Sequence, residues 1–323
     1  MTSKVAIIVE WDNARLSEVD RAREMLRRLN EQAASYARKS NTKFDLMLIY
    51  DPEEIASEIP STIVKECLNE ETWPGQISLL RAPNLPYYEQ KNFGVQQTDA
   101  EVILFVDSDV IPDDNWLAIL MDAFKDPAVS VVGGETYLTS DSLYEKLFSA
   151  FWQFDTKKPA GGELHEVRGF YANNVAFRGN VLRAHPFPKL ECFRGQCAML
   201  GQSLRARGVK IYRHGAARVS HPPPEGLSHF VNRAICHGHD MMMIGKLKNH
   251  SWFRASPLGS VWRLLRDLSK APARVSSRYR QAGLGPAGWI GALSLAVSYY
   301  WLKFLGDLLS FFAPRTVRKV FSI

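Results

Sequence analysis

Short apolar runs alternate with helical patterns along the first half of the chain. Between the first two runs, apolar residues recur at helical spacing from Val19 to Tyr36. This alternation predicts an α/β sheet covered by helices. The runs with the length and composition of strands are Val5–Val9, Phe44–Tyr50, Ile77–Leu80, Val102–Val106 and Val129–Val132.

Acidic side chains follow several of these runs where each strand is expected to end. Glu10 and Asp12 follow the first run, Asp51 follows the second, and Asp107 and Asp109 follow the fourth. One acid after a strand is often only a turn former. Because ligands of open α/β sheets bind at the carboxyl ends of the strands, the repeated pattern indicates a binding site at that edge.

The Asp107-Ser108-Asp109 sequence is the most specific of these signals. Two carboxylates at i and i+2, directly after an apolar strand, suit a hard cation such as Mg²⁺ or Mn²⁺ that also contacts phosphate oxygens. The acids that follow, Asp113 and Asp114, are interpreted as caps of the helix that contains Trp116. The motif therefore predicts metal-assisted chemistry on a phosphate-bearing ligand.

With this motif in place, the chain resembles the family 2 glycosyltransferases of the GT-A fold. The resemblance extends over roughly residues 4 to 240 and depends on several motifs in the same order, not on one alone. These motifs are Glu10 after the opening strand, Asp51, Tyr88–Gly94, Asp107–Asp109, Asn173–Arg178, Arg194–Cys197 ahead of Leu204–Gly208, and His221.

The resemblance implies a nucleotide-sugar donor and assigns residues to it. Glu10 and Asp51 would line the pocket for the nucleotide base. Lys91 and Asn92 would lie beside the donor, and Asp107 would hold its ribose. The implied donor is a nucleoside diphosphate sugar, with a UDP-linked sugar the commonest in the family.

The resemblance also implies a divalent cation, Mn²⁺ or Mg²⁺. Asp107 and Asp109 would hold the metal-bound diphosphate, and His221 would complete the coordination. A bound cation stabilises the negative charge that develops on the diphosphate as the bond to the sugar breaks. The implied reaction is an inverting transfer to an acceptor in polysaccharide, glycolipid or polyprenyl-linked glycan synthesis.

One segment departs from the family pattern. Where relatives carry an acidic pair that takes the acceptor proton, this chain has Gln196 and Cys197, within the sequence Arg194-Gly195-Gln196-Cys197. We interpret this as a subfamily motif and hypothesise that Glu191 is the general base, while Gln196 and Cys197 position the acceptor. Asn173-Asn174 and Arg194 are expected on the acceptor side. An exposed loop acid without a catalytic role is the alternative for Glu191.

The last third of the chain places basic residues ahead of an apolar stretch. The stretch from Gly285 to Leu302, about 18 residues, has no charged residue and carries Trp and Tyr of the interfacial type. An in-plane anchor and a single crossing both fit, and a helix that joins copies of the chain is the alternative. The basic residues are Arg254, Arg263, Arg266, Lys270, Arg274, Arg278 and Arg280.

Charge and cysteine content indicate which partners and which cellular compartment to expect. The net charge of +6 comes with basic residues placed late, next to the apolar stretch, which favours anionic lipid over nucleic acid as a partner. The four cysteines have neither zinc-site spacing nor a disulfide framework, so reduced thiols are expected. The predicted location is the cytoplasmic face of the cell membrane.

These patterns predict three segments: a GT-A-like domain over 1–240, a basic helical linker over 241–283, and an apolar membrane-associated tail over 284–323. The sequence His237-Gly238-His239-Asp240 is interpreted as the end of a helix over Leu227–Cys236 and an apolar contact surface, not as a metal site.

Two other functions fit parts of this pattern. A sugar nucleotidyltransferase shares the sheet, but its glycine-rich phosphate loop should follow the first strand, where Val9–Asn13 has no glycine. A non-catalytic relative that keeps the fold as a binding or scaffold module would explain the missing acidic pair. Retention of Asp107, Asp109 and His221 argues against that module.

Overall fold

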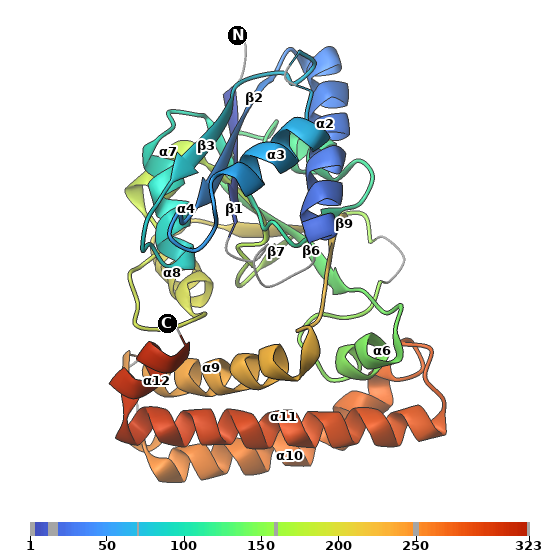
Figure 1. Cartoon of the computed structure of the whole chain (residues 1–323), viewed down its shortest axis with the longest axis vertical. Helices are drawn as coiled ribbons and strands as arrows, with labels where there is room; N and C mark the ends of the chain where they lie inside the picture. The colour runs from blue at the N-terminus through green and yellow to red at the C-terminus, as the bar shows by residue number, and fades with distance from the viewer. Residues whose placement is uncertain (1–3, 12–18, 70, 158–160, 248–251, 322–323) are drawn as a thin grey trace. The chain divides into compact units, whose positions relative to one another are not determined.

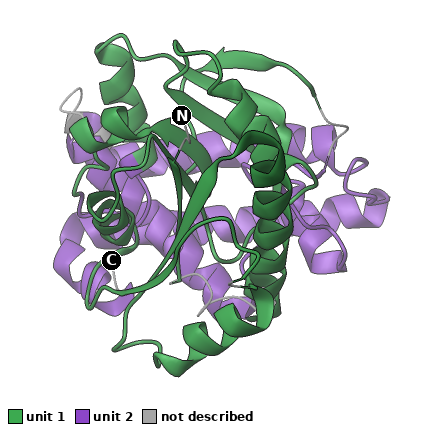
Figure 2. Ribbon diagram, turned by 90° about the horizontal axis from the view of Figure 1, so that it is seen from above, with its two compact units in different colours: residues 1–136, 159–189, 197–221 green, residues 137–158, 190–196, 222–323 purple. Residues whose placement is uncertain are grey.

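The computed structural model describes residues 4–11, 19–69, 71–157, 161–247 and 252–321, so Asp12 lies outside the described residues. The chain forms two compact units, drawn in different colours in Figure 2. The first, called the sheet unit, comprises residues 1–136, 159–189 and 197–221. The second, called the helical unit, comprises residues 137–158, 190–196 and 222–323.

Among the described residues, nine strands form one mixed sheet in the order β3-β2-β1-β4-β8-β6-β9-β5, with β7 paired to β9. Strands β3, β2, β1 and β4 are parallel, while β8 is antiparallel to β4 and β6. The strands are β1 (Lys4–Glu10), β2 (Lys43–Tyr50), β3 (Ile77–Arg81), β4 (Val102–Val106), β5 (Ile111–Pro112), β6 (Val131–Leu138), β7 (Leu164–Val167), β8 (Asn174–Arg178) and β9 (Ile211–His221).

Helices cover both faces of this sheet. In β1, alternate residues face opposite cores: Val5, Ile7 and Val9 pack on one side, and Ala6 and Ile8 on the other. The first core receives helices α2 (Val19–Ser40), α3 (Glu58–Cys67) and α5 (Trp116–Ala123), and the second receives α4 (Tyr87–Gln96), α7 (Gly179–Ala184) and α8 (Gln196–Ala206). Figure 1 shows α2 and α3 on one side of the sheet and α4 on the other. Burial on both faces explains why the parallel strands read as continuous apolar runs.

The expected α/β fold with helices against a sheet is confirmed. The five predicted strands correspond to β1, β2, β3, β4 and β6, although β6 begins at Val131 and runs on to Leu138. The interpretation of Asp113 and Asp114 as helix caps was wrong. Helix α5 begins after Asn115, while Asp113 pairs with Arg218 at 2.8 Å and Asp114 with Arg28 at 2.9 Å.

The helical unit is built on long helices that pack side by side (Figure 1). A Cβ atom on Gly238 would lie 2.0 Å from the Lys303 carbonyl oxygen, and one on Gly306 would lie 2.2 Å from the Ile235 carbonyl oxygen. The two glycines therefore allow α9 and α11 to approach closely. The helices are α6 (Leu143–Ser149), α9 (Gly226–Leu247), α10 (Pro257–Arg278), α11 (Pro286–Phe312) and α12 (Pro314–Phe321), with a 3-10 turn at Trp252–Ala255.

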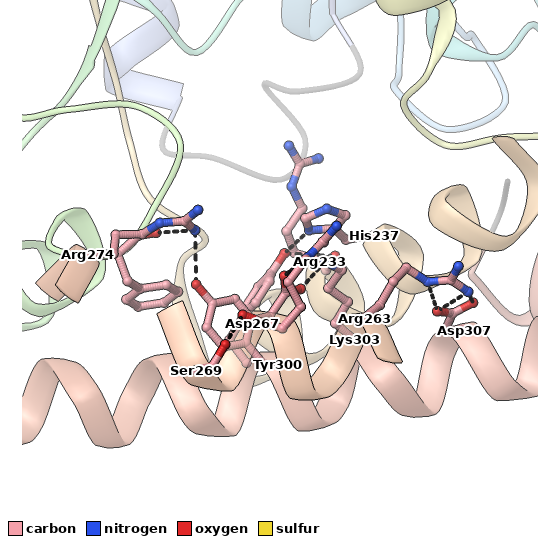
Figure 3. Close-up of polar contacts among 12 residues, drawn as sticks. Arg233, His237, Arg263, Asp267, Ser269, Arg274, Tyr300, Lys303 and Asp307 are labelled. Carbon is pink, nitrogen blue, oxygen red and sulfur yellow. Dashed lines mark hydrogen bonds and ion pairs between the residues drawn. The ribbon is translucent and has the colours of Figure 1, made fainter. Parts of the chain in front are cut away.

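Charged side chains are buried between α10 and α11. Arg263 makes two hydrogen bonds to Asp307, of 2.7 and 2.8 Å, and Lys303 lies 2.7 Å from Asp267 (Figure 3). Lys303 and Asp307, which interrupt the apolar tail in the sequence, thus face the neighbouring helix. No helix within the described ranges is both long enough and apolar enough to span a membrane.

Two sequence interpretations differ from the arrangement found. Helix α9 continues through His237–Asp240 to Leu247, so this segment is not a helix end. The compact units also divide the chain differently from the predicted segments 1–240, 241–283 and 284–323. The residues from 222 to 240 belong to the helical unit, together with the distant segments 137–158 and 190–196. Such a division depends on contacts between segments far apart in the sequence.

Candidate active site

The Asp107 carboxylate, just after β4, is held by two side chains of α4. Lys91 Nζ donates to Asp107 Oδ1 at 2.8 Å, and the Tyr87 hydroxyl lies 2.7 Å from both carboxylate oxygens. The Lys91 side chain is fully buried. A buried ammonium group is tolerated when it is paired and hydrogen-bonded. Lys91 is therefore a direct partner of Asp107 and fixes the position of its carboxylate.

Asp109 and His221 lie together at the ends of β4 and β9. His221 Nε2 is 3.7 Å from Asp109 Oδ2, which is beyond hydrogen-bonding distance. The pairing of β5 with β9, which sets Ile111 opposite Ser220, brings these distant residues together. Arg21 of α2 donates to the Asp109 carbonyl oxygen at 2.9 Å and to the Ser220 carbonyl oxygen at 3.3 Å. Arg21 thus ties the two segments to each other.

The Asp109–His221 pair fits one side of a divalent cation site. Asp109 Oδ1 is buried and accepts no hydrogen bond from the described part of the chain. A buried oxygen without a partner is costly unless a ligand satisfies it. Within the described residues no cluster of three or more His, Cys, Asp or Glu could hold a metal by itself. Mg²⁺ is commonly bound through one or two carboxylates plus substrate phosphates and water, so a site with few protein ligands is compatible with such a cation.

Glu10 and Asp51 occupy neighbouring strand ends, as expected from the parallel order of β1 and β2. Glu10 is fully buried at the end of β1, opposite Ile49 in the register. Asp51 accepts the backbone N–H of Glu53 at 2.9 Å and that of Asn84 at 2.7 Å. Asp51 therefore shapes the turns at this edge.

The amide side chains named from the sequence are engaged inside the sheet unit. Asn92 pairs with both backbone groups of Phe187, at 2.9 and 3.0 Å. Asn174 accepts from Trp116 Nε1 at 2.8 Å and donates to the carbonyl oxygens of Glu135 and Ala217. Asn173 Oδ1 lies 3.2 Å from the Thr136 hydroxyl. These bonds position strands and loops.

The Arg194–Cys197 motif is divided between the units. Cys197 belongs to the sheet unit, where its thiol lies 3.3 Å from the hydroxyl of Tyr88. Arg194 and Gln196 belong to the helical unit, where Gln196 bonds to the backbone of Gly195 and Cys192.

Glu191 also belongs to the helical unit. Its side chain is 63% exposed and pairs with Arg318. The structure thus gives Glu191 a solvent-accessible carboxylate, and the role of general base stays a prediction.

Sequence reasoning missed four residues that organise these segments. Tyr88 opens the Tyr88–Gly94 motif and Tyr87 directly precedes it; Tyr87 is one helical turn before Lys91, a spacing that could have identified it. Arg21 could not be identified locally because its partners lie far along the chain.

Asp240 is the fourth of these residues. It accepts the backbone N–H groups of Phe193 and Arg194, at 2.6 and 2.8 Å. Burial raises its pKa to about 7.

Comparisons with known proteins agree with this architecture. The chain is similar in structure to the mannosyltransferase PcManGT from Pyrobaculum calidifontis in complex with GDP-Man and Mn²⁺, with a TM-score of 0.58 and 12% identity over 98% of this chain and 88% of that chain. It is also similar to S. aureus TarS 1–349 in complex with UDP-GlcNAc, with a TM-score of 0.50 and 12% identity over 95% of this chain and 91% of that chain. At this identity the likeness shows the fold alone. No curated protein matches the chain.

A family model supplies the remaining evidence. The model described as Glycosyl transferase family 2 matches residues 20–184, more than half of the chain, and includes α4, Asp107 and Asp109. The family resemblance inferred from the motifs is therefore confirmed. The chain belongs to glycosyl transferase family 2 and is a glycosyltransferase.

Proposed function

We propose that this glycosyltransferase moves a sugar, with inversion at the anomeric carbon, from a nucleoside diphosphate sugar to a hydroxyl of a glycan or lipid-linked acceptor. A UDP-linked sugar is the first donor to test. The main support for this function is the pair of Asp109 and His221, in which Asp109 Oδ1 is buried and has no hydrogen-bond donor among the described residues. Both similar structures are complexes with a nucleotide sugar, and one of the two complexes also includes Mn²⁺.

Each side chain has a separate task in this proposal. Asp109 and His221 would hold Mn²⁺ or Mg²⁺, which when bound supplies positive charge to the departing diphosphate. Lys91 and Tyr87 hold the Asp107 carboxylate in position, where it would accept hydrogen bonds from hydroxyl groups of the donor. Arg21 holds the backbone of Asp109 and Ser220 so that the two ligand side chains remain neighbours. This preorganisation lowers the free energy needed to form the site.

Titration calorimetry with UDP and GDP, each with and without Mn²⁺, tests this proposal. Asp109→Ala and His221→Ala should each abolish metal-dependent nucleotide binding because both side chains are assigned as ligands. Asp114→Ala is the matched control, since it removes an exposed acid from the same segment that pairs only on the surface with Arg28. Mn²⁺-dependent affinity that is unchanged in both ligand variants would refute the metal site.

We also propose that the helical unit lies on the cytoplasmic face of a membrane, with α10 and α11 in the plane of the lipid. Arg263 of α10 and Lys303 of α11 are buried in ion pairs with the partner helix, while large apolar residues elsewhere on both helices are exposed. These exposed residues, called the apolar face, are Leu258, Val261, Trp262, Leu265, Ile290, Trp301, Leu305, Leu309 and Phe312. Exposed Lys270, Arg280, Arg315 and Lys319 supply the positive charge that anionic lipids attract.

Sedimentation with vesicles of phosphatidylglycerol and phosphatidylcholine tests the apolar face. The full chain should sediment with them, and Trp262→Glu combined with Trp301→Glu should release it into the supernatant. Leu227→Glu is the control, because Leu227 is 79% exposed in the same unit but outside the apolar face. The wild-type protein could instead fail to bind the vesicles and form a dimer that the double substitution dissociates. That result would show that the apolar face joins two copies of the chain.

A further inference from the structure

The pairing of β5 with β9 sets the separation of Asp109 and His221, the two candidate ligands of the cation. Asp109 lies just before β5, and His221 is the last residue of β9. Strand β5 contains only Ile111 and Pro112, and Pro112 has no N–H group to donate to β9. So short a pairing makes few backbone hydrogen bonds, and contacts outside it are needed to hold the two strands together.

Two polar side chains of α2, Arg21 and Gln32, hold the segments on either side of β5. The Arg21 guanidinium group donates to the carbonyl oxygen of Asp109 at 2.9 Å, and to the carbonyl oxygen and hydroxyl of Ser220 at 3.3 and 3.2 Å. Gln32 lies about three helical turns further along α2, and therefore on the same side of the helix. It donates to the Asp113 carbonyl oxygen at 3.0 Å. Helix α2 thus supports the chain both before and after β5.

Asp113 and Arg218 join the two strands at the other end of the pairing. The Asp113 N–H donates to the Arg218 carbonyl oxygen at 2.9 Å, which continues the ladder past β5. The side chains form an ion pair, with Arg218 Nη2 2.8 Å from Asp113 Oδ2, and their exposed fractions are only 17% and 15%. Loss of one partner of such a pair is costly, because the other charge is left in a poorly solvated place. The ion pair therefore fixes the spacing of β5 and β9 beyond their last paired residues.

The next acid along the chain, Asp114, has the same charge but a different environment. It pairs with Arg28 of α2 at 2.9 Å, and its side chain is 84% exposed. An exposed ion pair contributes little to structure, because water and salt screen its charges and both side chains lose freedom when they pair. Of these two neighbouring acids, Asp113 is therefore the one whose removal should change the geometry of β5 and β9.

We propose that Asp113 and Arg218 are positioning residues for the divalent cation: their ion pair holds β5 against β9, and the paired strands hold Asp109 beside His221. The inference rests on the proposed function, because it takes Asp109 and His221 as the cation ligands. Groups that orient metal ligands without touching the metal commonly change metal affinity by about 10–100-fold when they are removed. Without the ion pair, the two ligand side chains would share one geometry for less of the time, and the cation would bind a site that is no longer preformed.

Titration calorimetry of the full-length protein with UDP and with GDP, each in Mn²⁺ and in EDTA, tests this role. Asp113→Asn keeps the size of the side chain and the backbone hydrogen bond but removes the charge that pairs with Arg218. It should weaken Mn²⁺-dependent nucleotide binding by at least about tenfold and leave nucleotide binding in EDTA as in the wild type. Arg218→Gln should act alike, whereas Arg218→Lys keeps the charge and should retain more of the affinity. Asp114→Asn is the matched control, because it removes the same charge from an exposed pair and should leave Mn²⁺-dependent binding unchanged.

Circular dichroism verifies that each variant is folded. Wild-type Mn²⁺-dependent affinity in folded Asp113→Asn overturns the proposal. An equal loss in Asp114→Asn also overturns it, because the effect would then come from net charge, and so does an equal loss in Mn²⁺ and in EDTA. If Asp113→Asn does not fold, the double variant with Arg218→Gln decides by the same criteria, since no charge is then left buried.

The same titrations separate this inference from the proposed function. Mn²⁺-dependent affinity that persists in Asp109→Ala and His221→Ala refutes the metal site itself, and the positioning role with it. Affinity that is lost in those two variants but persists in Asp113→Asn refutes only the positioning role.

Discussion

One buried aspartate in each unit of the chain shows two opposite treatments of buried charge. In the helical unit, Arg263 and Asp307 satisfy each other with two hydrogen bonds between α10 and α11. In the sheet unit, Asp109 keeps one buried carboxylate oxygen without a donor among the described residues. A satisfied pair positions two helices, whereas an unsatisfied oxygen costs stability and indicates a ligand. The same residue type thus serves architecture in one unit and binding in the other.

Breaking the pair in the helical unit should give the largest loss of stability. Asp307→Ala leaves the buried Arg263 guanidinium without its carboxylate, and removal of one partner of a buried pair costs about 3–5 kcal/mol. Urea unfolding followed by circular dichroism measures the change. Arg263→Met combined with Asp307→Leu should recover most of the loss, because no charge is then left buried.

The matched variant in the sheet unit is Asp109→Ala. Because Asp109 Oδ1 has no donor to lose, its removal should leave the free energy of unfolding unchanged or raise it. A loss as large as that of Asp307→Ala would show that Asp109 is a structural residue, and the contrast between the units would disappear.

The next effect concerns Glu191, whose carboxylate is exposed and paired with Arg318. If Glu191 takes the acceptor proton, Glu191→Gln should lower turnover by at least about a hundredfold, the usual scale of general-base catalysis. Steady-state rates at saturating donor measure it. Arg318→Gln serves as the control because it removes the ion pair and keeps the carboxylate.

Cys197→Ser should cost far less than Glu191→Gln, since the thiol is assigned only a positioning role beside Tyr88. The opposite result would be near-normal turnover in Glu191→Gln and an inactive Cys197→Ser. It would assign the proton transfer to Cys197 or its neighbours, and Glu191 would then be a surface acid without a catalytic role.

The smallest expected effect is a pH dependence at Asp240. Its pKa is raised to about 7 in the folded chain, above an ordinary value of 3.8, so the folded state binds more protons between these values. The contribution of Asp240 to the free energy of unfolding is therefore greatest below pH 4, falls as pH rises toward 7, and levels off above it. The slope is at most about 1.4 kcal/mol per pH unit.

Urea unfolding of the wild type and of Asp240→Asn from pH 5 to pH 8 measures this effect, since groups common to both proteins cancel in the difference. The advantage of the wild type should shrink up to about pH 7. A difference that is constant over this range would show that Asp240 is ionised throughout.

Local patterns in the sequence were sufficient to predict the sheet and the positions of the acidic residues that follow its strands. Strand alternation, helical spacing and an Asp-x-Asp directly after an apolar run depend on the geometry of a few consecutive residues, so β1 to β4 and Asp107 to Asp109 could be located from them. The order of the family motifs added the expectation that His221 joins Asp109. That expectation came from resemblance and not from any property of residue 221 itself.

The partners of these residues were decided by the tertiary structure. His221 lies beside Asp109 because β5 pairs with β9, and Lys91 bonds directly to Asp107 because α4 packs against β1 and β2, and β1 is the neighbour of β4 in the sheet. The charges of α11, which read as interruptions of an apolar tail, are buried against α10 because only the assembled helices show which side faces inward. Pairings of this kind join elements far apart in the chain, and their register follows from packing across the whole unit. For that reason local sequence located the residues, whereas the fold determined which of them meet.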